Sequence, residues 1–459
     1  MHFRSETIND DYGASFAHDV QPVRLAGSSA AEVTTSDSVI PGASDSASEC
    51  PVAEASVTAV AKSAYPAPAA SPTQVAPDGI RFDFNFGARV VLPDGMDWRI
   101  RLSDVDTGNT LFESRNSGAV IHSTKRYFVP FSIEVWKGDR RVFEHKLDCR
   151  DRDVLIQFPV GTLGDVLAWF PYAEAFARKH GCRLTCALSG LIAPLLQPAY
   201  PDIRLVTHEE FERQQLADTF YATYSLGLFF DDADHHWQPC DFRYVGLGHT
   251  AGFILGIDRT DARPTLMLPD ETRPIAEPYV VIAAQSSSQA KYWNNPDGWR
   301  SVISFLKRAG YRVICIDQKA VHGTGMVWNH LPHGAEDETG DRPLTERARW
   351  LRHADAFIGL SSGLSWLAWA CGAPVVMISG FTHPSNEFDT PFRVINYHAC
   401  NSCWNDPRVR FDHHDFLWCP RHAGTSRQFE CTRLITAHQV TSAIARIPGL
   451  IPLPAAHPA

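Results

Sequence analysis

DVLIQFPVGTLGDVLAWF, residues 153–170, reads as a buried strand that passes through a glycine-containing turn into a helix. The run 153–158 is mostly apolar, which is typical of a strand covered on both faces. The helix is expected over about 165–179, and Gly181 can end it. A second strand follows at 183–188, and this strand–helix–strand order predicts a parallel sheet with helices on its faces.

The same alternation starts again at residue 279 and predicts a second α/β domain. The expected elements are strands at 279–283, 311–316, 355–360 and 375–379, and helices at 299–309, 344–353 and 363–371. A final helix is expected near 434–446. The sequence therefore predicts two Rossmann-like domains, 151–275 and 276–398, followed by a segment at 399–432 and by a closing helix and tail at 433–459.

The chain before residue 150 has a different composition and residue pattern. Residues 1–78 are rich in Ala, Ser and Pro from about residue 26 onward, which predicts a disordered tail. Residues 80–86 alternate between polar and apolar side chains, and we expect further short strands at 99–102, 127–129 and 132–136. Residues 79–150 therefore read as a small all-β domain.

Composition excludes several classes of protein. The 459 residues carry a formal net charge of −10, which disfavours a nucleic-acid or anionic-membrane partner. The chain holds no run of 18 apolar residues, so no membrane span is expected, and its first residues lack the apolar core of a secretory signal. The 11 cysteines are an odd number and several lie in strand-like segments, which favours the reducing cytoplasm.

The turn at 159–167 is the first candidate site. Its glycines allow a ligand to approach the backbone, and Thr162, Leu163 and Gly164 would line that approach. Asp165 would stand at the start of the helix, at the carboxyl end of the first strand, where open α/β sheets bind ligands. The alternative is an ordinary capping Asp that bonds the free N–H groups of the helix.

A second turn, at 359–366, occupies the corresponding place in the second domain. A strand ends at Ser361 and Ser362, and a helix starts at Gly363 and Leu364. The free N–H groups and positive dipole of a helix start suit a diphosphate. A plain serine cap is the alternative, and the pairing of this turn with the Asp165 turn favours phosphate.

A polar loop at 285–293 carries one cation, Lys291, at the same sheet edge. Its ammonium could offset the charge of a leaving phosphate. A solvated loop lysine is the alternative.

Four cysteines form the pattern C-x2-C-x15-C-x11-C near the end of the chain. Four thiolates at such spacing can bind zinc or iron as a tetrahedron, and the spacing does not separate the two metals. Unrelated thiols or a redox pair are the alternatives, but a redox pair would not need the last two cysteines. The predicted metal ligands are Cys400, Cys403, Cys419 and Cys431.

These motifs together resemble a known family. Residues 164–167, Lys291-Tyr292-Trp293, Ser361-Ser362-Gly363-Leu364 and 372–376 resemble the bacterial heptosyltransferases of glycosyltransferase family 9. The β-domain and the four-cysteine finger are similar to one branch, the autotransporter O-heptosyltransferases. The usual Asp-Thr-Gly-Leu of the family is replaced by Ser361-Ser362-Gly363-Leu364, which puts an acidic role at position 361 in doubt.

The resemblance implies a GT-B fold and a cytoplasmic enzyme that transfers heptose from ADP-heptose to serines of an autotransporter adhesin. It also implies iron in the finger and a dodecameric assembly. Asp165 would be the general base and Lys291 would stabilise the leaving group. Asp317, which ends the strand at 311–316, would bind the ribose hydroxyls. A lipopolysaccharide-core heptosyltransferase and a non-catalytic nucleotide-binding scaffold with a metal finger are the alternatives.

Overall fold

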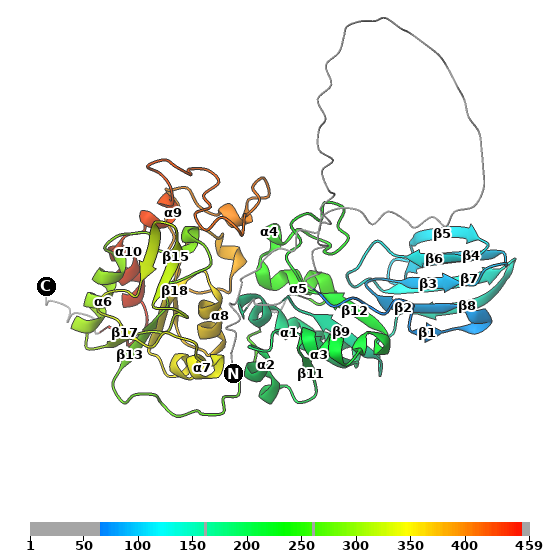
Figure 1. Cartoon of the computed structure of the whole chain (residues 1–459), viewed down its shortest axis with the longest axis horizontal. Helices are drawn as coiled ribbons and strands as arrows, with labels where there is room; N and C mark the ends of the chain where they lie inside the picture. The colour runs from blue at the N-terminus through cyan, green and yellow to red at the C-terminus, as the bar shows by residue number, and fades with distance from the viewer. Residues whose placement is uncertain (1–64, 160–162, 259–261, 452–459) are drawn as a thin grey trace, which may run out of the picture. The chain divides into compact units, whose positions relative to one another are not determined.

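The computed structural model describes residues 65–159, 163–258 and 262–451 (Figure 1). Most of the predicted tail and Thr162 lie outside the described residues. The prediction that the tail extends to residue 78 is wrong, because 65–78 are held by hydrogen bonds. Gln157 Nε2 donates to Pro66 O at 2.9 Å, and Arg89 Nη1 donates to Ala69 O at 2.7 Å.

The first sheet has the strand order β11-β10-β9-β12-β2-β3-β6, with β1 paired to β2. Pairing is parallel from β11 to β2 and antiparallel beyond. The predicted β-region and the first α/β unit therefore share one sheet. Its strands are β1 (Gln74–Val75), β2 (Arg81–Asn85), β3 (Arg89–Leu92), β6 (Ala119–His122), β9 (Asp153–Gln157), β10 (Arg183–Ala187), β11 (Arg204–Val206) and β12 (Ala222–Ser225).

A second, antiparallel sheet completes the β-region, in the order β5-β4-β7-β8. In β4 the residues Trp98, Ile100 and Leu102 are buried and alternate with more exposed ones. The predicted strand at 127–129 is absent, because Phe128 N–H bonds to Ile254 O at 2.8 Å instead of to a strand. The strands are β4 (Trp98–Asp104), β5 (Thr110–Asn116), β7 (Phe131–Lys137) and β8 (Arg140–Lys146).

The helices of the first α/β unit pack against its parallel strands. Helix α1 buries most of its length and packs against α5. The helices are α1 (Leu163–His180), α2 (Ala193–Leu196), α3 (His208–Arg213), α4 (Phe242–Val245) and α5 (Leu247–Leu255), with short 3-10 turns η1 (Pro77–Gly79), η2 (Gln197–Ala199) and η3 (Leu216–Thr219).

The second α/β unit is a fully parallel sheet in the order β17-β14-β13-β18-β19. All four residues of β13 are buried, as expected for a central strand. The strands are β13 (Tyr279–Ile282), β14 (Arg312–Cys315), β17 (Glu336–Asp337), β18 (Ala356–Leu360) and β19 (Val375–Ile378); β15 (Val321–Thr324) and β16 (Val327–His330) form a separate hairpin. The helical segments are η4 (Gln289–Lys291), α6 (Gly298–Arg308), α7 (Leu344–Arg352), α8 (Gly363–Ala370) and η5 (Pro384–Asn386).

The cysteine segment contains η6 (Cys403–Asn405) and α9 (Glu430–Arg433), and most of it has no regular structure. The closing helix α10 (Ala437–Ala445) starts with a capping box between Thr436 and Gln439 and packs on α6 and β19. None of the helices in the described ranges combines the length and apolar character needed to cross a bilayer. The predicted fold class, two Rossmann-like units with a β-region and a C-terminal cysteine segment, is confirmed.

Candidate functional site

Helices α1 and α8 begin against each other. A Cβ placed on Gly164 would lie 2.9 Å from Trp366 Cδ1 and 3.5 Å from Gly363 Cα. A Cβ placed on Gly363 would lie 3.1 Å from Leu163 Cβ. Only glycine lets the two turns approach so closely, so the two predicted motifs meet in space.

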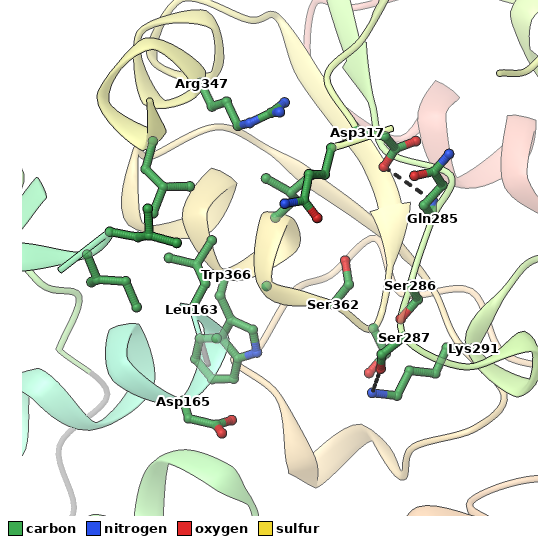
Figure 2. Close-up of a pocket in the computed structure, with 18 of the residues that line it drawn as sticks. Leu163, Asp165, Gln285, Ser286, Ser287, Lys291, Asp317, Arg347, Ser362 and Trp366 are labelled. Carbon is green, nitrogen blue, oxygen red and sulfur yellow. Dashed lines mark hydrogen bonds between the residues drawn. The ribbon is translucent and has the colours of Figure 1, made fainter. Parts of the chain in front are cut away.

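A cavity of about 640 Å³ opens at this contact (Figure 2). That volume lies within the range of pockets that hold a small ligand or cofactor. Its lining brings together every described residue that the sequence predicts for the active site: Leu163, Gly164, Asp165, Lys291, Asp317, Ser361, Ser362, Gly363 and Leu364.

Asp165 is the third residue of α1 and is only 4% exposed, although it lines the cavity. The Tyr65 hydroxyl lies close enough to sense its charge and donates to Leu226 O at 2.6 Å. Burial, and after it the Asp165 carboxylate, raises the pKa of Tyr65 above its ordinary range. The geometry thus holds a buried carboxylate at the wall of the cavity.

Lys291 ends the short turn η4 and reaches the cavity from the second unit. Its Nζ donates to Ser287 Oγ at 3.2 Å (Figure 2). The same ammonium lies over the rings of Phe381, Trp404 and Phe411, 5.4, 5.6 and 5.9 Å from their centroids. Burial first, and then the charge of Lys291, lowers the pKa of the nearby His413 to about 4.

The two serines at the start of α8 both line the cavity and differ in their hydrogen bonds. Ser361 Oγ donates to the buried Glu387 carboxylate, and Thr382 Oγ1 bonds to both, at 3.1 Å to Ser361 and 2.6 Å to Glu387. Arg393 pairs with the other oxygen of Glu387 at 3.0 Å. Ser362 Oγ is buried and has no hydrogen-bond partner among the described residues. The hydroxyl of Ser362 therefore suits a ligand better than that of Ser361.

Asp317 follows β14 and is 2% exposed. Its carboxylate accepts from Ala284 N at 2.8 Å and from Gln285 N at 3.2 Å, which ties the end of β13 to the end of β14. Burial, partly opposed by these bonds and by the charge of Arg347, raises its pKa to about 6. This carboxylate has a structural task in addition to any contact with a ribose.

Several cavity residues were not predicted from the sequence. Arg347 is buried beside Asp317 and donates to Ile316 O and to Gly340 O. Glu387 and His413 lie outside the helices and strands, and Trp404 lies in the short turn η6 of the cysteine segment. One signal could have identified Trp404, because it directly follows a predicted metal ligand, Cys403.

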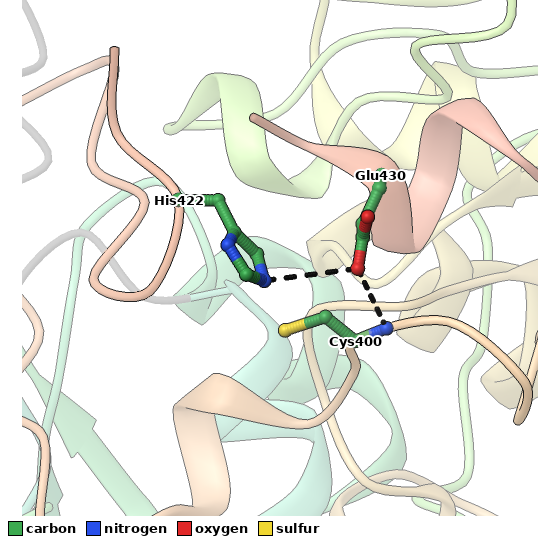
Figure 3. Close-up of side chains that lie close together, drawn as sticks. All are labelled: Cys400, His422 and Glu430. Atoms are coloured by element: carbon green, nitrogen blue, oxygen red, sulfur yellow. Dashed lines mark hydrogen bonds and ion pairs between the residues drawn. The ribbon is translucent and has the colours of Figure 1, made fainter. Parts of the chain in front are cut away.

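The four predicted metal ligands line one small cavity of about 20 Å³, which is close to the space of one water-sized ion. Burial, together with the neighbouring cysteine sulfurs, raises the pKa of Cys403 and Cys431 to about 12 each. Four cysteine thiolates are a donor set that a tetrahedral metal accepts, and a cation would favour their deprotonation. Among the described residues, the group of possible ligands that already lies close together includes only one of these cysteines. His422 and Glu430 lie beside Cys400, with ligand atoms within 4.8 Å of one another (Figure 3).

Comparisons with known proteins identify relatives of this chain. Residues 76–139 match the family described as glycosyltransferase TibC, N-terminal domain, and residues 254–410 match glycosyltransferase family 9 (heptosyltransferase). The autotransporter heptosyltransferase BAHTCr of Citrobacter rodentium is 54% identical over 378 residues, 82% of this chain and 91% of that protein.

The crystal structure of TibC, described as a dodecameric iron-containing heptosyltransferase in complex with ADP-D-beta-D-heptose, superposes with a TM-score of 0.79 at 52% identity. It covers 83% of this chain and 98% of TibC. BimC of Burkholderia thailandensis, described as an inactive autotransporter heptosyltransferase, is 50% identical over 83% of this chain and 89% of its own length. The chain therefore belongs to the autotransporter heptosyltransferase family.

Proposed function

We propose that this chain transfers heptose from ADP-heptose to serine hydroxyls of an autotransporter adhesin, with inversion at the sugar carbon C1. One observation carries the proposal: Asp165 and the start of α8 line the same cavity, because the turns at Gly164 and Gly363 touch. Transfer from a sugar diphosphate needs a base for the acceptor and a binding site for the diphosphate. The first unit supplies the base, and the helix start in the second unit supplies the anion-binding site. The family includes BimC, which is described as inactive, so membership alone does not support catalysis, and the residues of this cavity do.

The diphosphate would lie at the free N–H groups of α8, with Ser362 Oγ as a further donor and Lys291 as the counter-charge. Asp317 would receive the ribose hydroxyls. Residues 276–398 are then the donor domain and residues 151–275 the acceptor domain. Leu163 and Gly164 would border the sugar from the acceptor side.

In the chemical step, the acceptor serine Oγ forms a bond to C1 while the bond from C1 to the phosphate oxygen breaks. The electron pair of that bond leaves with ADP, and the serine proton passes to the Asp165 carboxylate. A carboxylate is a weak base for a hydroxyl, so proton transfer must come late and together with C1 attack. Lys291 and the α8 helix start act where negative charge grows, so they lower the barrier more than they tighten substrate binding.

We infer that Cys400, Cys403, Cys419 and Cys431 hold iron, as the TibC relative is described to do, with zinc the other metal that this donor set accepts. Four sulfur ligands leave no open position, so the ion stabilises the finger and takes no part in the transfer. By the same similarity we propose a dodecamer. The odd number of cysteines, several of them in strand-like segments, supports a location in the cytoplasm.

Mass spectrometry tests the function. The purified protein is incubated with ADP-heptose and either the passenger domain of an autotransporter adhesin or a lipopolysaccharide-core acceptor. Heptose on serines of the passenger domain is the expected result. Transfer to the lipid acceptor alone would identify a lipopolysaccharide enzyme, and ADP-heptose binding without any transfer would identify a scaffold.

A further inference from the structure

Three aromatic rings lie around the ammonium of Lys291 at the edge of the cavity described above, which is called the donor cavity from here on. Phe381, Trp404 and Phe411 lie within 5.4 to 5.9 Å of Nζ, and all three rings contact one another. Trp404 N–H also donates to Phe381 O at 3.1 Å, which fixes the backbone beneath the rings. The ammonium at the end of the flexible Lys291 side chain therefore has a defined position.

Two of these rings come from the cysteine segment, whereas Lys291 lies in the turn η4 of the second α/β unit. Trp404 directly follows Cys403, and Phe411 lies between Cys403 and Cys419. Trp404 also lines the donor cavity, together with Phe381. The segment that the cysteines hold together is thus one wall of the site where the leaving group would sit.

We propose that Trp404 is a positioning residue for Lys291, and that the cysteine finger belongs to the active site because it supplies this ring. The proposal rests on the role proposed above for Lys291. A cation over aromatic faces is held by their negative electrostatic potential, and surrounding rings exclude the water that would otherwise compete for the ammonium. Without Trp404 the ammonium would spread over several rotamers and would meet the leaving phosphate less often.

Trp418 offers a matched control. Both tryptophans are 7% exposed, each is adjacent to a finger cysteine, and both contact Phe381 and Phe411. Trp418 differs in that it neither lies over Lys291 nor lines the donor cavity. The variants Trp404→Leu, Trp404→Phe and Trp418→Leu are compared as full-length protein, in preparations with the same metal content per chain and similar melting temperatures.

We expect Trp404→Leu to lower kcat about tenfold, with KM within threefold of wild type. Trp404→Phe should restore most of the lost kcat. Trp418→Leu should keep both kcat and KM within threefold of wild type. A double-mutant cycle then separates positioning from general damage. In a Lys291→Ala background, Trp404→Leu should change kcat less than twofold, because the ring has no ammonium left to place. A tenfold loss that persists in that background, or an equal loss in Trp418→Leu, would overturn the proposal.

Binding of ADP, measured by calorimetry, keeps this test separate from the proposed function. If the wild-type chain binds ADP and transfers nothing, the transferase proposal fails while the cycle can still be read from ADP affinity. Trp404→Leu should then weaken ADP binding in the Lys291 protein and leave it unchanged in Lys291→Ala. Equal weakening in both backgrounds would contradict the positioning role.

Discussion

Ser361 and Ser362 are neighbours in opposite surroundings. The hydroxyl of Ser361 is bonded inside a buried network with Thr382, Glu387 and Arg393, whereas that of Ser362 has no partner among the described residues. The resembling heptosyltransferases place an aspartate at the first position. In this chain the Glu387 carboxylate already lies beside position 361, so an acidic side chain at 361 would be repelled by it.

Aspartate substitutions at the two positions should therefore behave differently. Ser361→Asp brings two carboxylates together in a buried place and should lower stability by about 2 kcal/mol or more. Ser362→Asp places a favoured capping residue at an N-cap with extended backbone, φ −152° and ψ 168°, and should leave the melting temperature nearly unchanged. Its negative charge should weaken ADP binding at least tenfold. Thermal melting and calorimetry check both, and a stable Ser361→Asp would contradict the account of the network.

Asp317 should make stability depend on pH. Its folded pKa of about 6 lies above the ordinary 3.8, so the folded protein binds a proton that the unfolded chain has released between these values. The carboxylate therefore costs stability as pH rises from about 4 to 6, by up to about 3 kcal/mol. The stability of Asp317→Asn relative to wild type should therefore increase as pH rises through this range. Melting temperatures of both proteins at several pH values measure the difference.

Asp337 provides a control of the opposite sign on the same sheet edge. Hydrogen bonds from Thr339 lower its pKa, so it contributes stability above its unfolded pKa and loses it at acid pH. The stability of Asp337→Asn relative to wild type should therefore decrease as pH rises. A constant difference between Asp317→Asn and wild type would show that burial does not govern the Asp317 carboxylate.

Residues at strand ends were predictable, and residues in long loops were not. Lys291 and the turn from Ser361 to Leu364 follow β13 and β18, neighbouring parallel strands whose carboxyl ends share an edge, so the pattern alone predicted that they lie close together. Asp165 follows β9 of the other sheet, and its approach to them was expected only from the resemblance to a two-domain family. Glu387 and Arg347 reach the cavity through contacts that no local pattern encodes.

At the scale of elements, the apolar runs predicted β9, α1 and β10 of the first unit, and β13, α6, β14, α7, β18, α8 and β19 of the second, to within a few residues. The other strands and helices of the two units are too short to show a clear period and were not predicted. The expected strand at 127–129 is absent because the ring of Phe128 packs on Phe176 and His180 of α1, while its backbone N–H bonds to Ile254 O of α5. The short β1 strand was missed because tertiary hydrogen bonds, rather than local propensity, hold the chain there. The cysteine segment was predicted from spacing, but its aromatic contacts with Lys291 were not.

Loss of the metal should loosen this segment before it changes the rest of the fold. Cys403→Ser removes one of the four proposed sulfur ligands, and most of the segment between the cysteines has no regular structure of its own. We expect loss of bound metal and faster proteolysis within 404–430, measured by elemental analysis and limited digestion. Cys182→Ser, a half-buried thiol in the first α/β unit, should change neither. A metal-bound, protease-resistant Cys403→Ser would contradict the ligand assignment.

At the scale of the whole molecule, the function depends on two turns that lie about 200 residues apart in the chain and touch in the fold. The contact depends on the missing side chains of Gly164 and Gly363. It brings the carboxylate of one unit and the helix start of the other into one cavity.

Gly164→Ala should keep the two turns apart. The new Cβ would lie 2.9 Å from Trp366 Cδ1, so one of the two must shift. We expect heptose transfer to fall about a hundredfold, because a displacement of this size is costly in a positioned site. Gly248→Ala in α5 meets nothing within 4 Å and should retain full activity, with equal or higher stability. Wild-type transfer by Gly164→Ala would show that the close contact is not needed.

The most direct test of the account compares wild type with Asp165→Asn, which keeps the shape of the side chain and removes its basicity. Rates of heptose transfer to an adhesin passenger domain are measured beside the affinity for ADP. The account predicts a loss of transfer of about 10² to 10⁴-fold with ADP affinity within threefold of wild type. An Asp165→Asn protein that keeps a tenth or more of wild-type turnover would contradict it.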